Sequence, residues 1–274
     1  MKIGFIGAGK VGCTFGLYLG RTNEIIGYMS RSAESADFAA NLTNSETFDD
    51  TLELFKLCEL VYITTPDAEI GPTWSRIVKQ VGSSGALEGK IVAHASGSLS
   101  SSEFKDADKL GAYAISTHPL FAIPSKTETA KELHKALIVI EGSREKIDKV
   151  TQMFSEAGNE VQTIPTEEKT RYHAAAVLAS NHVVALYHIA LKQLVECGFE
   201  TEKAQEALNP LFLGNALHIA DEGPIESLTG PAERNDVKTI NKHLEVLQGR
   251  AKSVYELLNQ EALEIAEEKR AHEK

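Results

Sequence analysis

Short apolar runs alternate with amphipathic stretches over residues 1–165 of the chain. The amphipathic stretches include EKIDKVTQMFSEAG, which has a glycine where a helix should stop. The apolar runs end in small or polar residues, as the buried strands of a parallel sheet do. These runs are KIGFIGAG, EIIGYMSRS, LVYITTPD, KIVAHASGS, AYAISTHPL and ALIVIEG. Their alternation with helices predicts a doubly wound α/β sheet, in which ligands bind at the carboxyl ends of the strands.

The strand pattern disappears after Pro165, and the rest of the chain is typical of helices. Helices are predicted over residues 166–197, about 201–220, and 231 to near the end, with breaks at CGFE and DEGPIESLTGP. We therefore expect two domains, an α/β domain over residues 1–165 and an all-helical domain over residues 166–274.

Charge and cysteine content argue against several classes of protein. With 28 basic and 39 acidic residues the net charge is −11, which argues against a partner that is a nucleic acid or an anionic membrane. Three separate cysteines, without a C-x-x-C pair, predict neither a disulfide framework nor a metal site and favour a reducing cytoplasm. The first apolar run is too short for a signal peptide, and we expect no stretch to reach the roughly 20 apolar residues of a membrane helix.

The first predicted strand leads into GAGKVG, which has the spacing G-x-G-x-x-G. The first glycine permits a tight turn, the second lets a pyrophosphate approach the backbone, and the third permits close packing of helix on strand. The helix that begins there presents N–H groups and the positive end of its dipole to phosphates. The motif alone is weak evidence, but its strand–turn–helix setting strengthens it. We predict a dinucleotide site formed by Gly7, Ala8, Gly9, Lys10, Val11 and Gly12.

The end of the second strand indicates which dinucleotide binds. An NAD site places a carboxylate there, about 20 residues past the glycines, to hold the ribose 2′-hydroxyl. This chain has Ser30, Arg31 and Ser32 instead. Arg31 can pair with a 2′-phosphate, and both serines can donate hydrogen bonds to it. The alternative is that Arg31 is a solvent-facing loop arginine. The pattern favours NADP as the cofactor.

Polar residues also follow three further predicted strands. They are Thr64, Thr65 and Pro66 after one strand, Ser96 after the next and His118 after the third. The first three are placed where a loop would run beneath the ribose and nicotinamide of the cofactor. Each residue alone is as compatible with a structural role, such as a turn cap or a buried histidine, as with substrate contact. Together they predict a polar cluster at one edge of the sheet.

The first predicted helix of the second domain includes TRYHAAAVLASNHVVALYHIALKQL, which is apolar on almost all sides. At 100° per residue, Lys169, Asn181 and His188 lie within about 80° of His173 on one stripe of a continuous helix. A reductase needs one group to transfer a proton and another to hold the substrate beside the nicotinamide. The alternative is a helix–helix interface that contains hydrogen-bonded core histidines.

The segment LTGPAERNDVKTINKHL contains a last candidate. Gly230 and Pro231 suit the start of a helix, with proline at the first helical position. Arg234 would lie in the first turn, where it can grip a substrate carboxylate or phosphate with two hydrogen bonds. An arrangement of Arg234 with Asp236 that stabilises the turn is an equally weighted alternative.

Five stretches spread along the chain resemble a known family. They are IGFIGAGKVG, HASGSLSS, THPL, EKTRYHAAAVLASN and LTGPAERND. The first half resembles the Rossmann domain of the 6-phosphogluconate dehydrogenase-like superfamily, which includes ketopantoate reductase, pyrroline-5-carboxylate reductase and F420-dependent NADP reductase. The whole chain is similar to Rossmann-like proteins that carry a C-terminal domain of unknown function, DUF2520.

The resemblance implies an NADP-binding Rossmann domain, a helical domain that often forms the dimer, and an active site between them. Relatives of known chemistry place a catalytic lysine, followed one turn later by an asparagine, at the start of the first helix of the second domain. Lys169 matches the lysine, whereas His173 stands at the asparagine position and Asn181 comes two turns later. We therefore expect His173 to be the acid–base group, with Lys169 as second choice and Asn181 as the residue that orients the substrate.

These features predict a cytoplasmic NADP(H)-dependent oxidoreductase that forms a homodimer through its helical domain. The expected substrate is a small anionic carbonyl, hydroxy or imine compound, with hydride transfer at C4 of the nicotinamide. The sequence does not distinguish these reactions from one that is linked to coenzyme F420. The alternative is a non-catalytic NADP-binding sensor or scaffold, since fold does not settle function. The catalytic candidates are His173, Lys169, Asn181, Ser96, His118 and Arg234.

Overall fold

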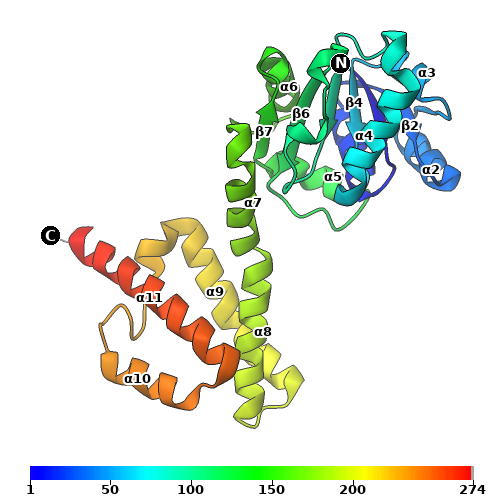
Figure 1. Ribbon diagram of the computed structural model, residues 1–274. Coiled ribbons are helices and arrows are strands. Elements are labelled where there is room, and N and C mark those ends of the chain that lie inside the picture. The colour runs from blue at the N-terminus through cyan, green and yellow to red at the C-terminus, as the bar shows by residue number, and fades with distance from the viewer. Residues whose placement is uncertain (273–274) are drawn as a thin grey trace. The chain divides into compact units, whose positions relative to one another are not determined.

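The computed structural model of the protein describes residues 1–272. The chain forms two compact units, which divide between Leu178 and Ala179 (Figure 1). The strands are β1 Lys2–Ile6, β2 Glu24–Met29, β3 Glu46–Thr47, β4 Leu60–Ile63, β5 Ile91–His94, β6 Tyr113–Pro119, β7 Ile138–Gly142 and β8 Val161–Thr163. The helices of the first unit are α1 Lys10–Leu19, α2 Ala33–Thr43, α3 Thr51–Leu57, α4 Asp67–Val81, α5 Thr129–Glu132, α6 Arg144–Glu156 and α7 Lys169–Leu178. Those of the second unit are α8 Asn181–Glu196, α9 Thr201–Ser227, α10 Val237–Val246 and α11 Gly249–His272.

All strands lie in one sheet of order β3-β2-β1-β4-β5-β6-β7-β8. The six predicted strands are confirmed, and the α/β prediction with them. The two additional strands, β3 and β8, are only two and three residues long, too short to leave a pattern in the sequence. Every pairing is parallel except that of β6 with β7, which is antiparallel and which the sequence pattern did not indicate. Between these two strands the chain packs the short helix α5 against α1, so β7 enters the sheet from the opposite end.

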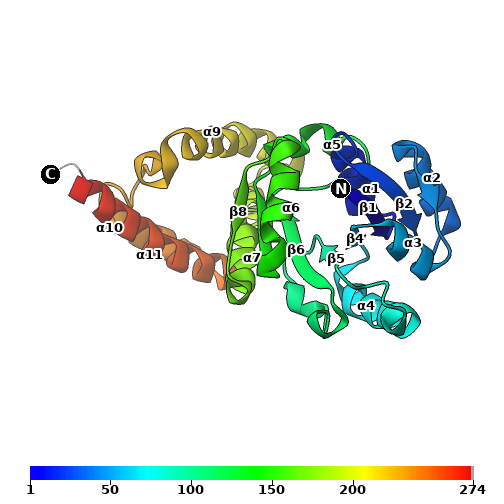
Figure 2. The same cartoon turned by 90° about the horizontal axis from the view of Figure 1, so that it is seen from above.

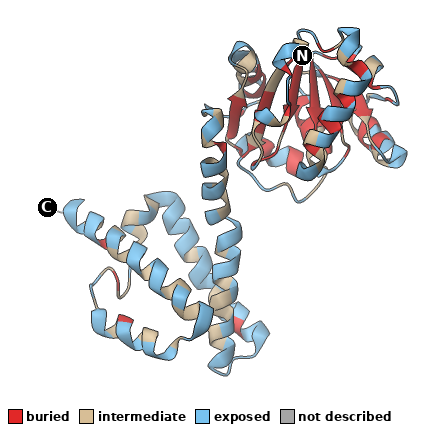
Figure 3. Cartoon of the chain, viewed as in Figure 1, coloured by how far each residue is buried: buried red, intermediate tan, exposed pale blue. Residues whose placement is uncertain are grey.

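Helices cover both faces of the sheet and close two hydrophobic clusters (Figure 2). Because side chains alternate along a strand, Tyr62 packs with Phe15 of α1 on one face, whereas its neighbour Val61 packs with Trp74 of α4 on the other. Both clusters consist of fully buried apolar side chains, which gather on the strands (Figure 3). This unit therefore contains a core that can hold the strand ends rigidly.

The turn between β1 and α1 has the geometry that the glycine motif predicts. Gly7 has a φ of +119°, a conformation that side chains disfavour. A Cβ on Gly12 would lie 2.3 Å from the carbonyl oxygen of Gly7, so only glycine lets α1 start this close to the turn.

The predicted helix over residues 166–197 is interrupted. A short 3₁₀ turn at Thr166–Glu168 leads into α7, and α8 begins only after Ala179 and Ser180, which lie in a turn. Ser180 has φ and ψ of −126° and −81°, outside the helical region, and its hydroxyl donates to Oδ1 of Asn181. The expectation of a single stripe from Lys169 to His188 was therefore wrong, because it assumed a continuous helix.

The helix predicted from residue 231 begins later than expected. Pro231 lies in a turn, and α10 begins at Val237 because the Asp236 carboxylate accepts a hydrogen bond from the backbone N–H of Thr239. Asp236 thus provides the cap that the sequence pattern assigned to the Gly230–Pro231 pair. The same stretch ends at Val246, and a separate helix, α11, continues from Gly249.

One helical stretch of residues 1–272, Thr166–Glu196, is long and apolar enough to cross a membrane by length and composition alone. From the sequence we expected no stretch as long and apolar as this one. The stretch is divided by the turn at Ala179 and Ser180, and buried helices of soluble proteins share its composition. It is weak evidence for a membrane span.

The second unit buries little of its own apolar surface (Figure 3). Among residues 179–272, only Ala204, Ala232, Ile240 and Ala266 are buried. Large apolar side chains are instead exposed along α8 and α9. They include Val184, Leu186, Leu211, Leu213, Leu217 and Ile219.

Candidate functional site

A cavity of about 480 Å³ lies where β1, β2 and β4 end at the carboxyl edge of the sheet. The glycine turn, the end of β2, and the loop after β4 all contribute to its wall. The lining residues are Ile6, Gly7, Ala8, Gly9, Met29, Ser30, Arg31, Ser32, Ser35, Thr51, Thr64, Thr65, Pro66, Glu69, Thr73, Arg76, Ile77, Gln80 and Lys126. Three segments predicted separately from the sequence thus meet around one cavity.

The glycine turn contributes backbone to this cavity. A Cβ added to Gly9 would meet nothing within 4 Å, so the backbone here faces open space. Lys10, Val11 and Gly12 do not line the cavity, and Gly12 instead packs against the turn beneath it. Three of the six predicted residues, Gly7, Ala8 and Gly9, thus line the cavity, and cofactor binding by all six stays a prediction.

At the end of β2, Ser30, Arg31 and Ser32 all line the cavity, as does Ser35. The Ser32 hydroxyl oxygen caps α2 by accepting the backbone N–H of Ser35 at 3.2 Å, which leaves its own O–H free to donate. Arg31 is exposed and has no ion-pair partner among residues 1–272. This corner offers a cation, hydroxyl groups and a helix N-terminus, and Glu34, the carboxylate in the first turn of α2, does not line the cavity.

The two threonines after β4 have different roles. Thr64 donates its hydroxyl to the Gly7 carbonyl at 2.7 Å and so holds the glycine turn. The Thr65 hydroxyl oxygen is buried and finds no hydrogen-bond partner within residues 1–272. A buried hydroxyl without a partner costs free energy. Its position on the cavity wall fits a ligand that carries hydroxyl groups, and the open backbone at Gly9 fits one that carries phosphates.

Sequence reasoning missed the far wall of the cavity. Thr51 of α3 and Thr73, Arg76 and Gln80 of α4 line it, and Arg76 forms a 3.6 Å ion pair with Glu69. These residues recur at helical spacing with polar character, as the solvated face of any amphipathic helix does. Only the packing of α4 across the edge of the sheet shows that this face meets a cavity.

A polar cluster continues from this loop toward β5 and β6. Asp67, the residue after Pro66, accepts hydrogen bonds from Ser96 Oγ at 2.7 Å and Ser98 Oγ at 2.9 Å. Ser96 also caps the following turn, since its oxygen accepts the backbone N–H of Ser98 and of Leu99. The predicted alternative of a turn cap is therefore present, together with a bond to a carboxylate that the sequence did not indicate.

Two histidines meet above Gly97. His118 from the end of β6 and His173 from α7 have ring centroids 6.2 Å apart, at an interplanar angle of 81°. A Cβ on Gly97 would lie 2.6 Å from Cδ2 of His173 and 2.7 Å from Nε2 of His118. The absence of a side chain at Gly97 is what allows both rings to pack there.

Tyr172 completes this group, and no sequence pattern singled it out. Its hydroxyl lies 2.6 Å from Nδ1 of His118. Burial, and then the charge of Lys169, lower the pKa of His118 to about 4, whereas burial raises the pKa of Tyr172 to about 12. Both groups are therefore neutral at pH 7, and they can position a ligand atom through hydrogen bonds without adding charge.

Lys169 lies beneath the histidines and is almost fully buried, with 1% of its surface exposed. Its Nζ donates to Ser116 Oγ at 2.7 Å. Burial lowers the pKa of Lys169 to about 8, while the negative charges of Glu141 and Asp67 act in the opposite direction. The ammonium is thus still mostly protonated at pH 7, and it places a positive charge under the polar cluster.

Two more buried groups support the cluster from below. Ser96 donates its backbone N–H to Nδ1 of His94, and His94 Nε2 contacts the carbonyl of Ser100 at 3.0 Å, so the ring is a neutral tautomer with its proton on Nε2. Burial lowers the pKa of His94 in agreement with this. The Glu141 carboxylate accepts three hydrogen bonds, two from Ser101 and one from Thr166.

The remaining predicted residues, Asn181 and Arg234, belong to the second unit, and their part in a site stays a prediction. Arg234 is exposed and forms no ion pair among residues 1–272. Asp236 accepts two hydrogen bonds from Thr239 and so caps the helix. These bonds, and then the charge of Arg234, lower the pKa of Asp236.

Comparison with known proteins agrees with this fold. Residues 1–119 match a family described as a Rossmann-like domain, and residues 136–262 match the domain of unknown function DUF2520. The DUF2520 match begins before β7, so it includes β7 and β8 although both strands are part of the same sheet as β1 to β6. A search of the curated proteins finds no match to this sequence.

Several solved structures are similar along almost the whole chain. A Thermotoga maritima protein is 26% identical over 98% of this chain and 99% of its own, with a TM-score of 0.79. An imine reductase from Myxococcus stipitatus, solved with NADP⁺, is 15% identical over 96% of this chain and 94% of its own, with a TM-score of 0.65. A Plasmodium falciparum pyrroline carboxylate reductase with NADP bound is 12% identical over 99% and 97%, with a TM-score of 0.58.

The sheet, the glycine turn and the cavity at its carboxyl edge define the class, a Rossmann-like α/β protein with a helical C-terminal region. Within that class the chain carries a region that matches the Rossmann-like domain, followed by a region that matches the DUF2520 domain.

Proposed function

We propose that the protein is an NADP(H)-dependent oxidoreductase acting on a small anionic carbonyl, hydroxy or imine compound. The observation that carries this proposal is that a cavity and a cluster of titratable groups lie next to each other at the carboxyl edge of the sheet. Pro66 lines a cavity with the chemistry of a dinucleotide site, and the next residue, Asp67, accepts hydrogen bonds from the serines of the polar cluster. The imine and pyrroline carboxylate reductases that share the fold also support it.

The cavity fits the adenosine half and the phosphates of the cofactor. The backbone at Gly9 would face the pyrophosphate, the partnerless Thr65 hydroxyl would meet a ribose hydroxyl, and Arg31 would pair with the 2′-phosphate. A bound nicotinamide supplies or accepts a hydride at its C4. The protein's own contribution is to orient the substrate and to move one proton.

Exposure decides between the two candidates for the proton. Lys169 is almost fully buried and is bonded to Ser116, whereas His173 is only partly buried and lies at the surface of the cluster. We therefore assign proton transfer to His173, and substrate orientation to His118 and Tyr172. Lys169 acts as a buried cation that adds to the effect of burial in lowering the pKa of His118, and that favours negative charge on the substrate oxygen.

The test is turnover by the parent protein and by His173→Ala, with NADPH and a panel of small keto acids and cyclic imines. General acid–base groups contribute typically 10²- to 10⁴-fold, so His173→Ala should lose turnover by about that factor while it binds NADPH normally. His134→Ala, at an exposed histidine of the same unit, is the matched control and should keep full activity.

Two outcomes contradict the proposal at different levels. Undiminished turnover in His173→Ala would remove the assignment of the proton and leave an oxidoreductase. NADPH binding without turnover of any compound in the panel would favour the sensor or scaffold alternative.

A further inference from the structure

The segment between β6 and α5 brings a lysine to the cavity that neither the glycine motif nor the end of β2 supplies. Lys126 lines the cavity together with Ser30, Arg31, Ser32 and Ser35. It lies more than 90 residues from them along the chain, and only the way this segment packs across α1 explains its presence there.

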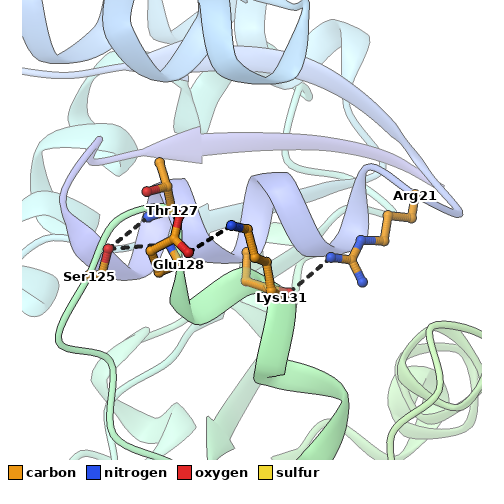
Figure 4. A network of polar contacts seen from close by, with 6 residues as sticks. Arg21, Ser125, Thr127, Glu128 and Lys131 are labelled. Carbon is orange, nitrogen blue, oxygen red and sulfur yellow. Dashed lines mark hydrogen bonds and ion pairs between the residues drawn. The ribbon is translucent and has the colours of Figure 1, made fainter.

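Hydrogen bonds fasten the segment at both sides of Lys126. Thr14, a fully buried residue of α1, contacts the carbonyl of Ser125 at 3.2 Å. Ser125 Oγ in turn accepts the backbone N–H groups of Thr127 and Glu128 (Figure 4). The Arg21 guanidinium, at the other end of α1, donates to the carbonyl of Ala130 at 3.1 Å. The backbone at Lys126 is therefore held in place against α1.

The side chain of Lys126 is directed to α2. Its Nζ lies 5.2 Å from the ring centroid of Phe38, close enough for a cation–π contact. Phe38 lies three residues after Ser35, so the two side chains are neighbours on one face of α2. The ammonium is thus placed beside the N-terminus of α2, where Ser32 and Ser35 meet the cavity.

The balance of charge in the cavity leaves this lysine available to a ligand. Three cations and one carboxylate line the wall, and the carboxylate, Glu69, already pairs with Arg76. Arg31 and Lys126 form no ion pair within residues 1–272. Two cations without ion-pair partners among residues 1–272 therefore face a corner that contains hydroxyl groups and the N-terminus of α2, whose first turn carries Glu34 outside the cavity lining.

We propose that Lys126 binds the 2′-phosphate of NADP together with Arg31, and so sets the preference of this protein for NADP over NAD. The inference rests on the proposed function, because it names a further specificity residue of the same cofactor site. Phe38 acts as a positioning residue, since its ring holds the ammonium beside α2.

The test compares adenosine 2′,5′-bisphosphate with 5′-AMP as ligands, because the two differ only in the 2′-phosphate. Calorimetric titration of Lys126→Gln should show at least a tenfold loss of affinity for the bisphosphate and unchanged affinity for 5′-AMP. Lys126→Arg should keep most of the affinity for the bisphosphate, and Phe38→Leu should lose a smaller part of it. The matched control is Lys131→Gln, at an exposed lysine of the same segment that pairs with Glu128 (Figure 4).

Two results would overturn the inference. Equal losses for both ligands would place Lys126 on the 5′-phosphate, and unchanged affinities for both ligands would give it only the structural contact with Phe38. A parent protein that binds neither NADPH nor NADH would instead contradict the proposed function itself, so the two failures are distinguishable.

Discussion

His118 and Lys169 lie in one cluster, yet at neutral pH the histidine is uncharged and the lysine is positively charged. Burial disfavours the charged form of each, but the lysine begins from a pKa of 10.5 and is lowered only to about 8. The histidine begins from 6.5 and is lowered to about 4, partly by the lysine itself. The cluster therefore combines one fixed positive charge with neutral hydrogen-bonding groups around it.

The depressed pKa of His118 predicts loss of stability in mild acid. The unfolded chain binds a proton at this histidine as the pH falls below 6.5, whereas the folded chain resists until about 4. The free energy of unfolding should thus decrease between these pH values, by up to about 3 kcal/mol, and His118 should contribute nothing above this window. Urea unfolding across pH 4 to 7 should show a shallower decrease for His118→Gln than for the parent or His134→Gln. Equal slopes in all three would contradict the buried, neutral state of His118.

Gly97 predicts a second effect at the scale of one residue. An added methyl group in Gly97→Ala would overlap both imidazole rings and push them apart. We expect a stability loss of about 1–3 kcal/mol and at least a tenfold loss of turnover, with binding of adenosine 2′,5′-bisphosphate unchanged. Gly214→Ala, at a helical glycine with open space around it, is the control for the change of residue type. Full turnover in Gly97→Ala would show that the two histidines do not act as one site.

At the scale of elements, α1 is the helix on which the cofactor cavity depends most. It approaches the sheet closely because Gly12 and Gly16 have no side chains. A Cβ on Gly16 would lie 1.7 Å from the Tyr28 hydroxyl oxygen, and a Cβ on Gly12 would overlap backbone. The overlap at Gly16 involves a side-chain hydroxyl that Tyr28→Phe would remove, whereas the overlap at Gly12 involves a backbone oxygen that no substitution removes.

This difference predicts a specific double-mutant result. Gly16→Ala should destabilise the protein by about 1–3 kcal/mol, and Tyr28→Phe should recover part of the loss because it removes the hydroxyl group. Recovery should be partial, since a ring carbon would still lie 3.0 Å from the new methyl group. The same Tyr28→Phe change should not rescue Gly12→Ala. Urea unfolding of the three single and two double variants is the measurement, and it would contradict the packing described here if Tyr28→Phe had the same effect on Gly16→Ala and on Gly12→Ala.

Elements were predictable from sequence where one local cause dominates. A buried strand is an uninterrupted apolar run, so the six longer strands were recognisable, and the glycine spacing fixed the first turn. The end of α7 was not predictable, because Ala179 and Ser180 are neither glycine nor proline and both are exposed, so no local pattern marks the turn. Asp236 has a recognisable capping chemistry, but the preceding Gly230–Pro231 pair offered a competing start.

The candidate site was predictable only in part, for the same reason. Residues at strand ends, such as Ser96 and His118, are brought together by the topology of any doubly wound sheet. Tyr172, Arg76 and Lys126 join the site through the packing of α7, α4 and the segment after β6. Nothing in their local sequence distinguishes them from solvated polar residues.

At the scale of the whole molecule, the second unit indicates a partner. Its described residues bury only four side chains completely and leave leucines exposed, such as Leu213 at 57% and Leu217 at 62%. Exposed apolar surface of this extent marks an association surface. A second copy of the chain is the occupant that the resemblance implies, so we expect a homodimer through the helical unit.

This expectation is tested by sedimentation. The parent protein should have twice the 29.8 kDa mass of one chain, and Leu217→Glu should shift it toward the mass of a monomer. Leu57→Glu changes an exposed leucine of the α/β unit and should leave the mass unchanged. A monomeric parent would contradict the dimer, and its exposed leucines would then need a different partner.

The central claim is that the cavity at the carboxyl edge of the sheet binds NADP, and direct titration of the parent and Arg31→Ala with NADPH and NADH tests it. The account predicts that the parent binds NADPH at least tenfold more tightly than NADH. Arg31→Ala should sharply reduce that preference, with Lys126 left as the remaining cation for the 2′-phosphate, and should leave NADH binding unchanged. If the parent binds neither nucleotide at millimolar concentration, or if Arg31→Ala keeps the preference, the cofactor assignment is contradicted.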